Sequence, residues 1–334
     1  MTAASVNLAT SYLGLQLPSP IIVGSCGLTN SVRDVRACAE AGAGAVVLKS
    51  IFEEQIAVEV GQVQAASDQS HHHAEAEAYI AAYGTQNAVG EYLKLIQGAK
   101  QAVAIPVIAS INCASNRSWT KFAGQIEAAG ADALELNIFV PPAMRDRTGG
   151  ENEKIYSDVV AEVKKQVSIP VAVKIGYFFS SLSEIAGKLC RAGADGLVLF
   201  NRFYPPDIDI ERFQVVAGPP LSVPEEMHLT LRTVAQLAGK VGCDIVASTG
   251  IHDGAAVIKQ LLAGAAAVQV ASVLYRRQIA HLETMTAELR AWMARKGFER
   301  LESFRGKMKQ DAWPDGAAYD RVQFMKRTVG SELI

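Results

Sequence analysis

One phrase recurs four times along the chain and limits its possible folds more than any other feature. Each copy has a turn of small residues containing glycine, followed by a short apolar run that ends in polar residues. The copies are AGAGAVVLKS at 41–50, AGADALELNI at 129–138, AGADGLVLFN at 192–201 and AGAAAVQVAS at 263–272. Glycine in such a turn suits the end of a helix, where the backbone becomes left-handed. Because the runs lack a polar face, each is typical of a parallel strand buried on both sides.

Four partner runs lie between these copies and complete a set of eight. They are IIVGS at 21–25, PVIASI at 106–111, PVAVKI at 170–175 and DIVASTG at 244–250. Helical patterns such as SVRDVRACAEA and GAAVIKQLLA separate most of the eight runs. Eight alternating strands and helices with crossovers of one hand close into a barrel. We therefore predict an α/β fold, a single-domain (β/α)8 TIM barrel. The alternative is a doubly wound open sheet, which the lack of GxGxxG after the first strand disfavours.

Composition narrows the classes of function. The chain has 334 residues, 49% hydrophobic and 20% charged, and a formal net charge of −2. The near-neutral charge disfavours a general binder of nucleic acid or membrane surfaces. No apolar run is long enough for a membrane span, and the start, MTAASVNLATSYLG, lacks a signal peptide pattern, so we expect a cytoplasmic protein. The five cysteines are Cys26, Cys38, Cys113, Cys190 and Cys243. They form no CxxC pair, which favours reduced thiols over disulfides. We therefore expect neither a metal site nor an iron–sulfur centre.

Polar residues stand where the predicted strands end, which is where barrels of this kind carry their active sites. They are Ser25, Cys26, Lys49, Ser50, Asn112, Asn137, Lys174, Asn201, Ser248, Thr249 and Ser272. A lysine in an apolar strand is costly unless it meets an anion or an acceptor. For Lys174, a core carboxylate such as Glu135 is the alternative partner. Small residues at 248–251 and 271–273 follow strands seven and eight, the usual phosphate site of these barrels, although small residues also fit tight turns.

From about Val6 to Gln310 the sequence resembles the dihydroorotate dehydrogenase family, most of all its soluble class 1 members. The resemblance rests on NLATSYLGLQLPSPIIVGSCG, VLKS, ELNI, VAVKIGYFF, GLVLFNRF, STGI, QVASVLY and KGFERLESFRGKMK, which occur in this order. It implies a flavoprotein of pyrimidine biosynthesis that binds FMN at the barrel mouth and forms a homodimer. Residues 1–310 would form the FMN-binding barrel, and 311–334 an extension that packs on the barrel or on a second subunit.

The resemblance also implies roles for individual residues. Lys174 would lie beside the pyrimidine edge of the flavin, where a fixed cation stabilises negative charge on the reduced ring. The residues implied around the ring are Ser25, Cys26, Gly27, Lys49, Ser50, Asn112, Asn137 and Asn201. Those on the phosphate side are Ser248, Thr249, Gly250, Ile251, Ser272 and Val273. Those at the substrate are Lys49, Asn87, Asn137, Asn201 and Arg202.

The substrate half departs from the family pattern. Class 1 members carry a cysteine base in Asn-Leu-Ser-Cys-Pro-Asn, and the matching residues 137–142 read NIFVPP, so that Val140 takes the position of the cysteine and Pro142 that of an asparagine. A second substrate loop keeps Asn87 but has Ala81 in place of an asparagine. Lost hydrogen-bond partners weaken transition-state binding on the order of 10²-fold.

The catalytic base is thus unassigned. Cys113 is the nearest thiol by topology, although a buried structural cysteine is the commoner role. Glu151, Glu153 and Tyr83 are weaker candidates.

Three functions therefore compete. The first is an FMN-dependent oxidoreductase that oxidises dihydroorotate or a related CH–CH substrate and passes electrons to a soluble acceptor or a partner. The second is an FMN-binding paralogue with another substrate or no activity of its own. The third is a lyase that forms a Schiff base through Lys174 with a phosphorylated substrate. The two flavoproteins would be yellow, and the lyase colourless.

The sequence also predicts the structure of two further segments. The connection 52–87 is long enough to cover the active site or to touch a partner, and we interpret its His71-His72-His73 as a polar loop, because adjacent side chains do not converge on one metal ion. Residues 276–296 predict one amphipathic helix.

Overall fold

The computed structural model describes residues 6–59, 88–115, 118–142, 146–203 and 205–310. Within these ranges, parallel strands follow one another around a closed barrel in the order β4-β3-β13-β12-β9-β8-β7-β6, and β4 pairs with β6 to close it. The strands are β3 (Ile21–Val23), β4 (Ala45–Val47), β6 (Val107–Cys113), β7 (Ala133–Ile138), β8 (Val171–Ile175), β9 (Gly196–Leu199), β12 (Asp244–Ser248) and β13 (Ala267–Val270). Each lies within or next to one of the eight apolar runs, so the predicted (β/α)8 barrel is confirmed.

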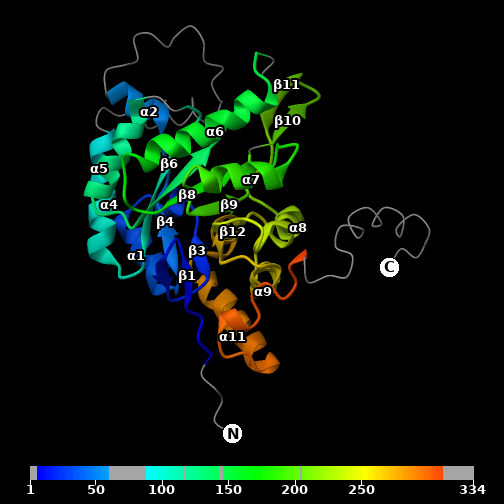
Figure 1. Cartoon of the computed structure of the whole chain (residues 1–334). Coiled ribbons are helices and arrows are strands. Elements are labelled where there is room, and N and C mark those ends of the chain that lie inside the picture. Colours follow the sequence, from blue (N-terminus) through cyan, green and yellow to red (C-terminus); the bar gives the residue numbers. More distant parts are fainter. Residues whose placement is uncertain (1–5, 60–87, 116–117, 143–145, 204, 311–334) are drawn as a thin grey trace, which may run out of the picture.

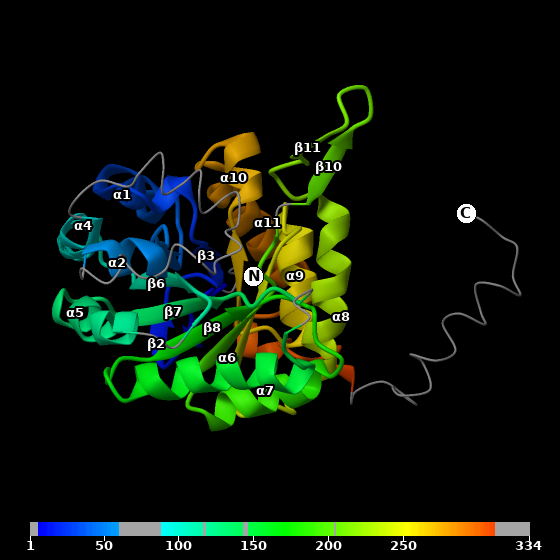
Figure 2. The ribbon, with the colours of Figure 1, turned by 90° about the horizontal axis from the view of Figure 1, so that it is seen from above.

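Helices surround the barrel on its outer side, as Figures 1 and 2 show. They are α1 (Val32–Glu40), α2 (Glu53–Glu59), α4 (Ala88–Ala102), α5 (Phe122–Ala128), α6 (Gly149–Lys164), α7 (Leu182–Arg191), α8 (Met227–Leu237), α9 (Gly254–Ala263), α10 (Ser272–Arg277) and α11 (His281–Lys296). Four of these helices end at the recurring glycines. Gly42, Gly130, Gly193 and Gly264 have φ of 90°, 95°, 109° and 116°, so the repeated glycine allows the left-handed turn that leads each helix into the next strand.

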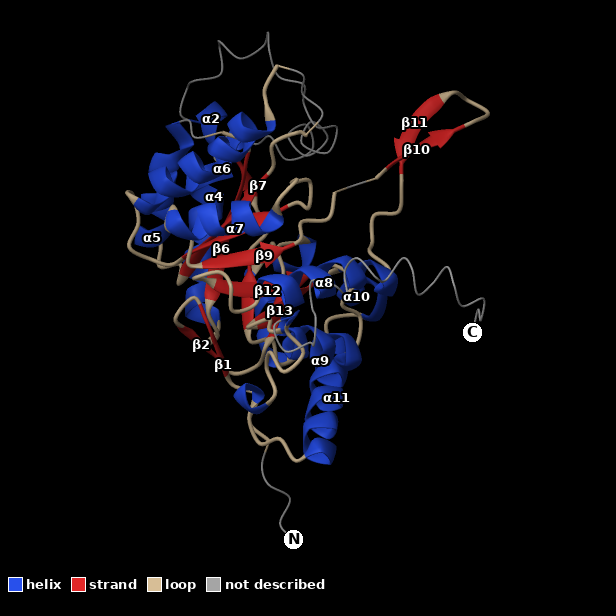
Figure 3. Cartoon of the chain, turned by 45° about the vertical axis from the view of Figure 1, so that its right-hand side comes forward, coloured by secondary structure: helices blue, strands red, loops and turns tan. Residues whose placement is uncertain are grey.

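Side chains alternate between the barrel interior and the helix-facing side along each strand. Ala172 on β8 belongs to the interior cluster, whereas its neighbours Val171 and Val173 pack in the cluster between strands and helices. The same alternation turns Lys174 inward. The hairpin of β1 (Thr10–Tyr12) and β2 (Leu15–Leu17) packs against the interior cluster and covers the end of the barrel at which the strands begin (Figure 3).

Two sequence-based expectations are wrong. Cys190 and Cys243 form a disulfide, with their Cα atoms 5.9 Å apart, although we expected reduced thiols. Because β9 and β12 are neighbours in the barrel, the segments that precede them lie side by side despite 53 residues of separation. The predicted single helix 276–296 is instead split into α10 and α11, because the backbone turns left-handed at Gln278 (φ 65°).

The outer surface carries one further element, a hairpin of β10 (Pro206–Asp209) and β11 (Gln214–Ala217) that projects away from the barrel (Figure 3). It exposes Ile208, Phe213 and Val215, which are 66%, 90% and 76% accessible. Among the described residues no helix is long and apolar enough to cross a membrane. Most of the 52–87 connection, with its three histidines, and the extension 311–334 lie outside the described residues.

Candidate active site

Lys174 lies inside the barrel near the carboxyl end of β8 and is held by two buried side chains. Its Nζ donates a hydrogen bond to Oε1 of Gln269 on β13 (3.1 Å) and lies 3.9 Å from Oε1 of Glu135 on β7. The Gln269 amide nitrogen in turn donates to the Glu135 carboxylate. Lys174 is 9% exposed, Gln269 2% and Glu135 1%. The pairing with Glu135 that the sequence left open is therefore present. It fixes the Lys174 side chain inside the barrel, and its Nζ keeps further N–H donors for a ligand.

An amide pair lies next to this cation. Asn137 stands beside Lys174 in the register of β7 and β8. The Asn201 amide nitrogen donates to Oδ1 of Asn137 (2.8 Å). The two predicted strand-end asparagines are thus brought together and each keeps groups for a further hydrogen bond.

A chain of hydroxyls joins the segments after β3 and β4 to β6. Ser25 Oγ lies 2.9 Å from Ser50 Oγ, which lies 2.8 Å from Ser110 Oγ. Tyr92 on α4 donates to the Ser110 carbonyl (3.0 Å) and accepts from the Ser110 backbone N–H (2.7 Å). These bonds tie the residues that follow β3 and β4 to the middle of β6, beside Lys49.

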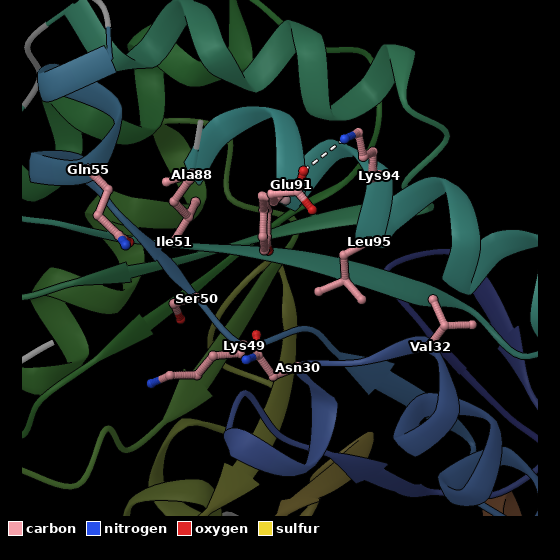
Figure 4. A pocket seen from close by; sticks show the side chains of 11 residues that line it. Asn30, Val32, Lys49, Ser50, Ile51, Gln55, Ala88, Glu91, Lys94 and Leu95 are labelled. Atoms are coloured by element: carbon pink, nitrogen blue, oxygen red, sulfur yellow. Dashed lines mark hydrogen bonds and ion pairs between the residues drawn. The ribbon is translucent and has the colours of Figure 1, made fainter. Parts of the chain in front are cut away.

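Lys49 and Ser50 also line a cavity of about 430 Å³. Figure 4 shows both side chains on one wall, with Gln55 of α2 across from Asn30. The ion pair of Lys94 with Glu91 on α4 lies at its edge (2.8 Å). Lys49 and Ser50 are the predicted site residues that line this cavity, whereas Lys174, Asn137 and Asn201 do not line it.

The loops after β12 and β13 adjoin each other, as expected for a phosphate site. Thr249 and Gly250 both have left-handed backbone, with φ of 75° and 74°. Ser272 begins α10, and its Oγ accepts from the backbone N–H of Ser222 (3.0 Å). Ser222 Oγ lies 3.1 Å from Nε2 of His252. The segment around Ser222 therefore packs against the predicted phosphate residues.

Arg202 is occupied elsewhere. Its Nε lies 2.9 Å from Oε2 of Glu226, and its Nη1 donates to the carbonyls of Pro219 (3.1 Å) and Pro220 (3.2 Å). The guanidinium therefore anchors the segment before α8. Asn87, another predicted substrate residue, lies outside the described residues.

The candidate bases have other roles. Val140 is 5% exposed, and its backbone N–H donates to the Tyr156 hydroxyl on α6 (3.2 Å). Cys113 is buried, and its burial together with the carboxylates of Glu53 and Glu54 raises the pKa of its thiol well above the usual value, which disfavours the reactive thiolate.

Two of the weaker candidates are engaged in or beside α6. Glu151 closes the capping box of α6 with Thr148, accepting from the Thr148 backbone N–H (2.6 Å). Glu153 pairs with Lys188 (2.9 Å). Tyr83 lies outside the described residues, and among those described no group of three His, Cys, Asp or Glu side chains could hold a metal ion.

Glu53 is a site-side carboxylate that sequence reasoning missed. It follows β5 (Ile51–Phe52), which pairs with the end of β6 at Asn112. Its carboxylate accepts from the backbone N–H groups of Ala114 (3.0 Å) and Ser115 (3.2 Å). Burial raises its pKa to about 7, against the lowering effect of these hydrogen bonds. The available signal was its position directly after the apolar pair Ile51-Phe52.

A (β/α)8 barrel with a fixed cation and an amide pair at the carboxyl ends of its strands is the frame of an enzyme. Residues 7–293 match the family model described as dihydroorotate dehydrogenase. The chain therefore belongs to the dihydroorotate dehydrogenase family, whose members are oxidoreductases acting on CH–CH groups.

The similarity to individual relatives extends over nearly the whole length of each. A protein of Thermoplasma volcanium, the catalytic subunit of dihydroorotate dehydrogenase B (NAD(+)), is 28% identical over 90% of this chain and 98% of its own. A putative dihydroorotate dehydrogenase A (fumarate) of Aeropyrum pernix is 30% identical over 90% of this chain and 97% of its own. A further catalytic subunit of the B type, from Methanosarcina acetivorans, is 30% identical over 88% and 93%.

Proposed function

We propose that this chain is an FMN-dependent oxidoreductase of the dihydroorotate dehydrogenase type. The observation that carries the proposal is Lys174, an ammonium fixed inside the barrel by Gln269 and Glu135 beside the amides of Asn137 and Asn201. A preorganised cation stabilises negative charge that develops on a bound group. When bound, FMN would supply a two-electron acceptor for hydride from a CH–CH substrate.

The described residues fit FMN across the barrel mouth. Lys174 keeps N–H donors for the ring, and the Ser272 hydroxyl, which accepts from Ser222, keeps its proton for a phosphate oxygen. A side chain at Gly27 would meet the Tyr275 hydroxyl at 2.7 Å and displace it, whereas glycine leaves the backbone open there. We assign the ring to Ser25, Cys26, Gly27, Lys49, Ser50, Asn112, Asn137, Lys174 and Asn201. We assign the phosphate to Ser248, Thr249, Gly250, Ile251, Ser272 and Val273.

The substrate is dihydroorotate or a related small CH–CH compound. The second candidate, an FMN-binding paralogue with another substrate or no activity of its own, is favoured by Val140. Its buried side chain is apolar and cannot take up a proton at the position of the family's base, and its backbone N–H donates to the Tyr156 hydroxyl.

We further propose a cytoplasmic homodimer that passes electrons to a soluble acceptor or a partner subunit. The support for a partner is that two of the relatives named above are catalytic subunits.

The Schiff-base lyase requires a neutral amine. The Lys174 Nζ is hydrogen-bonded to Gln269 and lies 3.9 Å from the Glu135 carboxylate, so the amine is already held by two side chains of the barrel. This contact disfavours a lyase and leaves the oxidoreductase as the better supported function.

The test is the anaerobic visible spectrum of the FMN-loaded protein before and after addition of dihydroorotate. Bleaching of the flavin band would support the first candidate, and an unbleached band the second. Two results together would contradict both candidates and favour the lyase. The protein would take up no FMN, and borohydride would reduce a Schiff base between Lys174 and a phosphorylated aldehyde to a stable adduct.

A further inference from the structure

Four aromatic rings from three neighbouring loops cluster at the barrel mouth. Phe139 follows β7, Tyr177 and Phe178 follow β8, and Phe203 follows β9. The ring centroids of Phe139 and Phe203 lie 4.3 Å apart, those of Phe178 and Phe203 5.4 Å, and those of Tyr177 and Phe178 4.3 Å. Tyr177 and Phe178 are 44% and 46% exposed, so these rings pack on one another at the surface rather than in the core.

Two members of this aromatic cluster (Phe139, Tyr177, Phe178, Phe203) follow closely after the amide pair in the sequence. Phe139 lies two residues beyond Asn137, and Phe203 lies two residues beyond Asn201. The two amides are hydrogen-bonded at 2.8 Å, and the two rings are in contact. The Lys174 cation, the amides of Asn137 and Asn201, and the apolar rings of Phe139 and Phe203 therefore follow one another across the site.

Gly176 makes this arrangement possible. It follows β8 two residues after Lys174, and a Cβ built on it would lie 2.7 Å from Cε2 of Phe203. Any larger residue would displace the Phe203 ring. The close approach of that ring to the end of β8 is therefore built into the sequence.

Two of the groups expected for an acidic ring substrate are diverted or replaced in the described part of the chain, the guanidinium of Arg202 and the side chain at position 140. The Arg202 guanidinium is bound to Glu226 and to two carbonyls, so that it is not directed at a ligand carboxylate. The loop after β7 presents Phe139, Val140 and two prolines in place of hydrogen-bonding side chains. Among the described residues, both changes remove hydrogen-bond partners that a carboxylated polar ring would use.

Resting on the second candidate of the proposed function, an FMN-binding family member with a substrate other than dihydroorotate, we propose that this site takes a planar conjugated carbonyl compound with an apolar face and no carboxylate. Its carbonyl would accept a hydrogen bond from the amides of Asn137 and Asn201. Its flat face would stack against the rings of Phe139 and Phe203, the arrangement that aromatic side chains favour. The aromatic cluster is then the specificity determinant of the family member described here.

The test compares two probes by isothermal titration calorimetry on the full chain, with FMN content measured on the same samples. Coumarin is flat, apolar and conjugated to a carbonyl, whereas orotate is flat, polar and carboxylated. We expect coumarin to bind at least about tenfold more tightly than orotate. Phe139→Ser should weaken coumarin binding about tenfold, the order of one aromatic contact.

Phe178→Ser is a second variant, chosen because this half-exposed ring costs little stability, and it should weaken coumarin binding in the same direction. Phe213→Ser, on the 90% exposed ring of the β10–β11 hairpin, is the matched control and should change nothing. Orotate binding as tight as coumarin, or coumarin binding unchanged in both ring variants, overturns the inference. A protein that contains no FMN would contradict the proposed function instead. In that case the ratio of the coumarin and orotate affinities still tests whether the site prefers an apolar planar ligand.

Discussion

Replacing Glu135 by glutamine should weaken the fold through a single charge. The carboxylate is 1% exposed and lies 3.9 Å from the Lys174 ammonium. At an effective dielectric constant of about 20, two unit charges at that distance attract by about 4 kcal/mol. Glutamine keeps an oxygen to accept the hydrogen bond from Gln269, so the variant removes the charge and little else. Loss of one partner of a buried ion pair costs about 3–5 kcal/mol, and we expect the free energy of unfolding to fall by that amount.

The assay is urea unfolding of the FMN-free protein, followed by circular dichroism. The matched control is Asp158→Asn, which breaks the exposed pair with Lys154 on α6 (2.6 Å) and should cost about 0.5 kcal/mol or less. Adding Lys174→Met to Glu135→Gln should recover part of the loss, because the uncompensated buried charge is then removed. A Glu135→Gln protein as stable as the control variant would refute the reasoning.

Three further predictions concern other parts of the molecule. The folded pKa of Glu53, about 7, lies above the ordinary 4.5, so its stabilising contribution is complete below pH 4.5 and is lost as pH rises through 7. Urea midpoints at pH 5 and pH 8 should differ in wild type and converge in Glu53→Gln, and an equal difference in both proteins would refute this. The Cys190–Cys243 disulfide closes 53 residues, so reduction should cost about 4 kcal/mol of stability by the chain-entropy estimate. Dithiothreitol should lower the unfolding midpoint of wild type and leave Cys190→Ser/Cys243→Ser unaffected, whereas an unchanged wild-type midpoint would contradict the bridge. Val140→Cys should not create dihydroorotate turnover in an anaerobic flavin-bleaching assay, because Phe139 and Phe203 still occupy the substrate side; measurable bleaching would show that the base alone was missing.

The barrel could be predicted because its signals are local. Each repeated phrase combines a glycine that ends a helix with an apolar run that forms a buried strand, and both properties depend on a few adjacent residues. The polar residues at the strand ends followed from the same pattern, since parallel strands bring their carboxyl ends to one face. Lys174, Asn137 and Asn201 were found in this way.

The remaining features depend on contacts between distant segments. The bridge between Cys190 and Cys243 exists because β9 and β12 are neighbours in the barrel, which spacing in the sequence does not encode. The role of Gln269 follows from its position across the barrel from Glu135, and the fate of Arg202 follows from Glu226 on a later segment. The break between α10 and α11 needs a left-handed backbone at Gln278, and glutamine rarely adopts that conformation, so the residue type did not predict it.

The central claim is that FMN binds beside Lys174, and the FMN content of purified protein tests it most directly. We expect a yellow protein with about one FMN per chain after addition of excess FMN and gel filtration. Lys174→Met should lower that content, whereas Lys154→Met, which removes an exposed lysine of α6, should leave it unchanged. A colourless protein that takes up no FMN, or a Lys174→Met variant that binds FMN as wild type does, would contradict the claim.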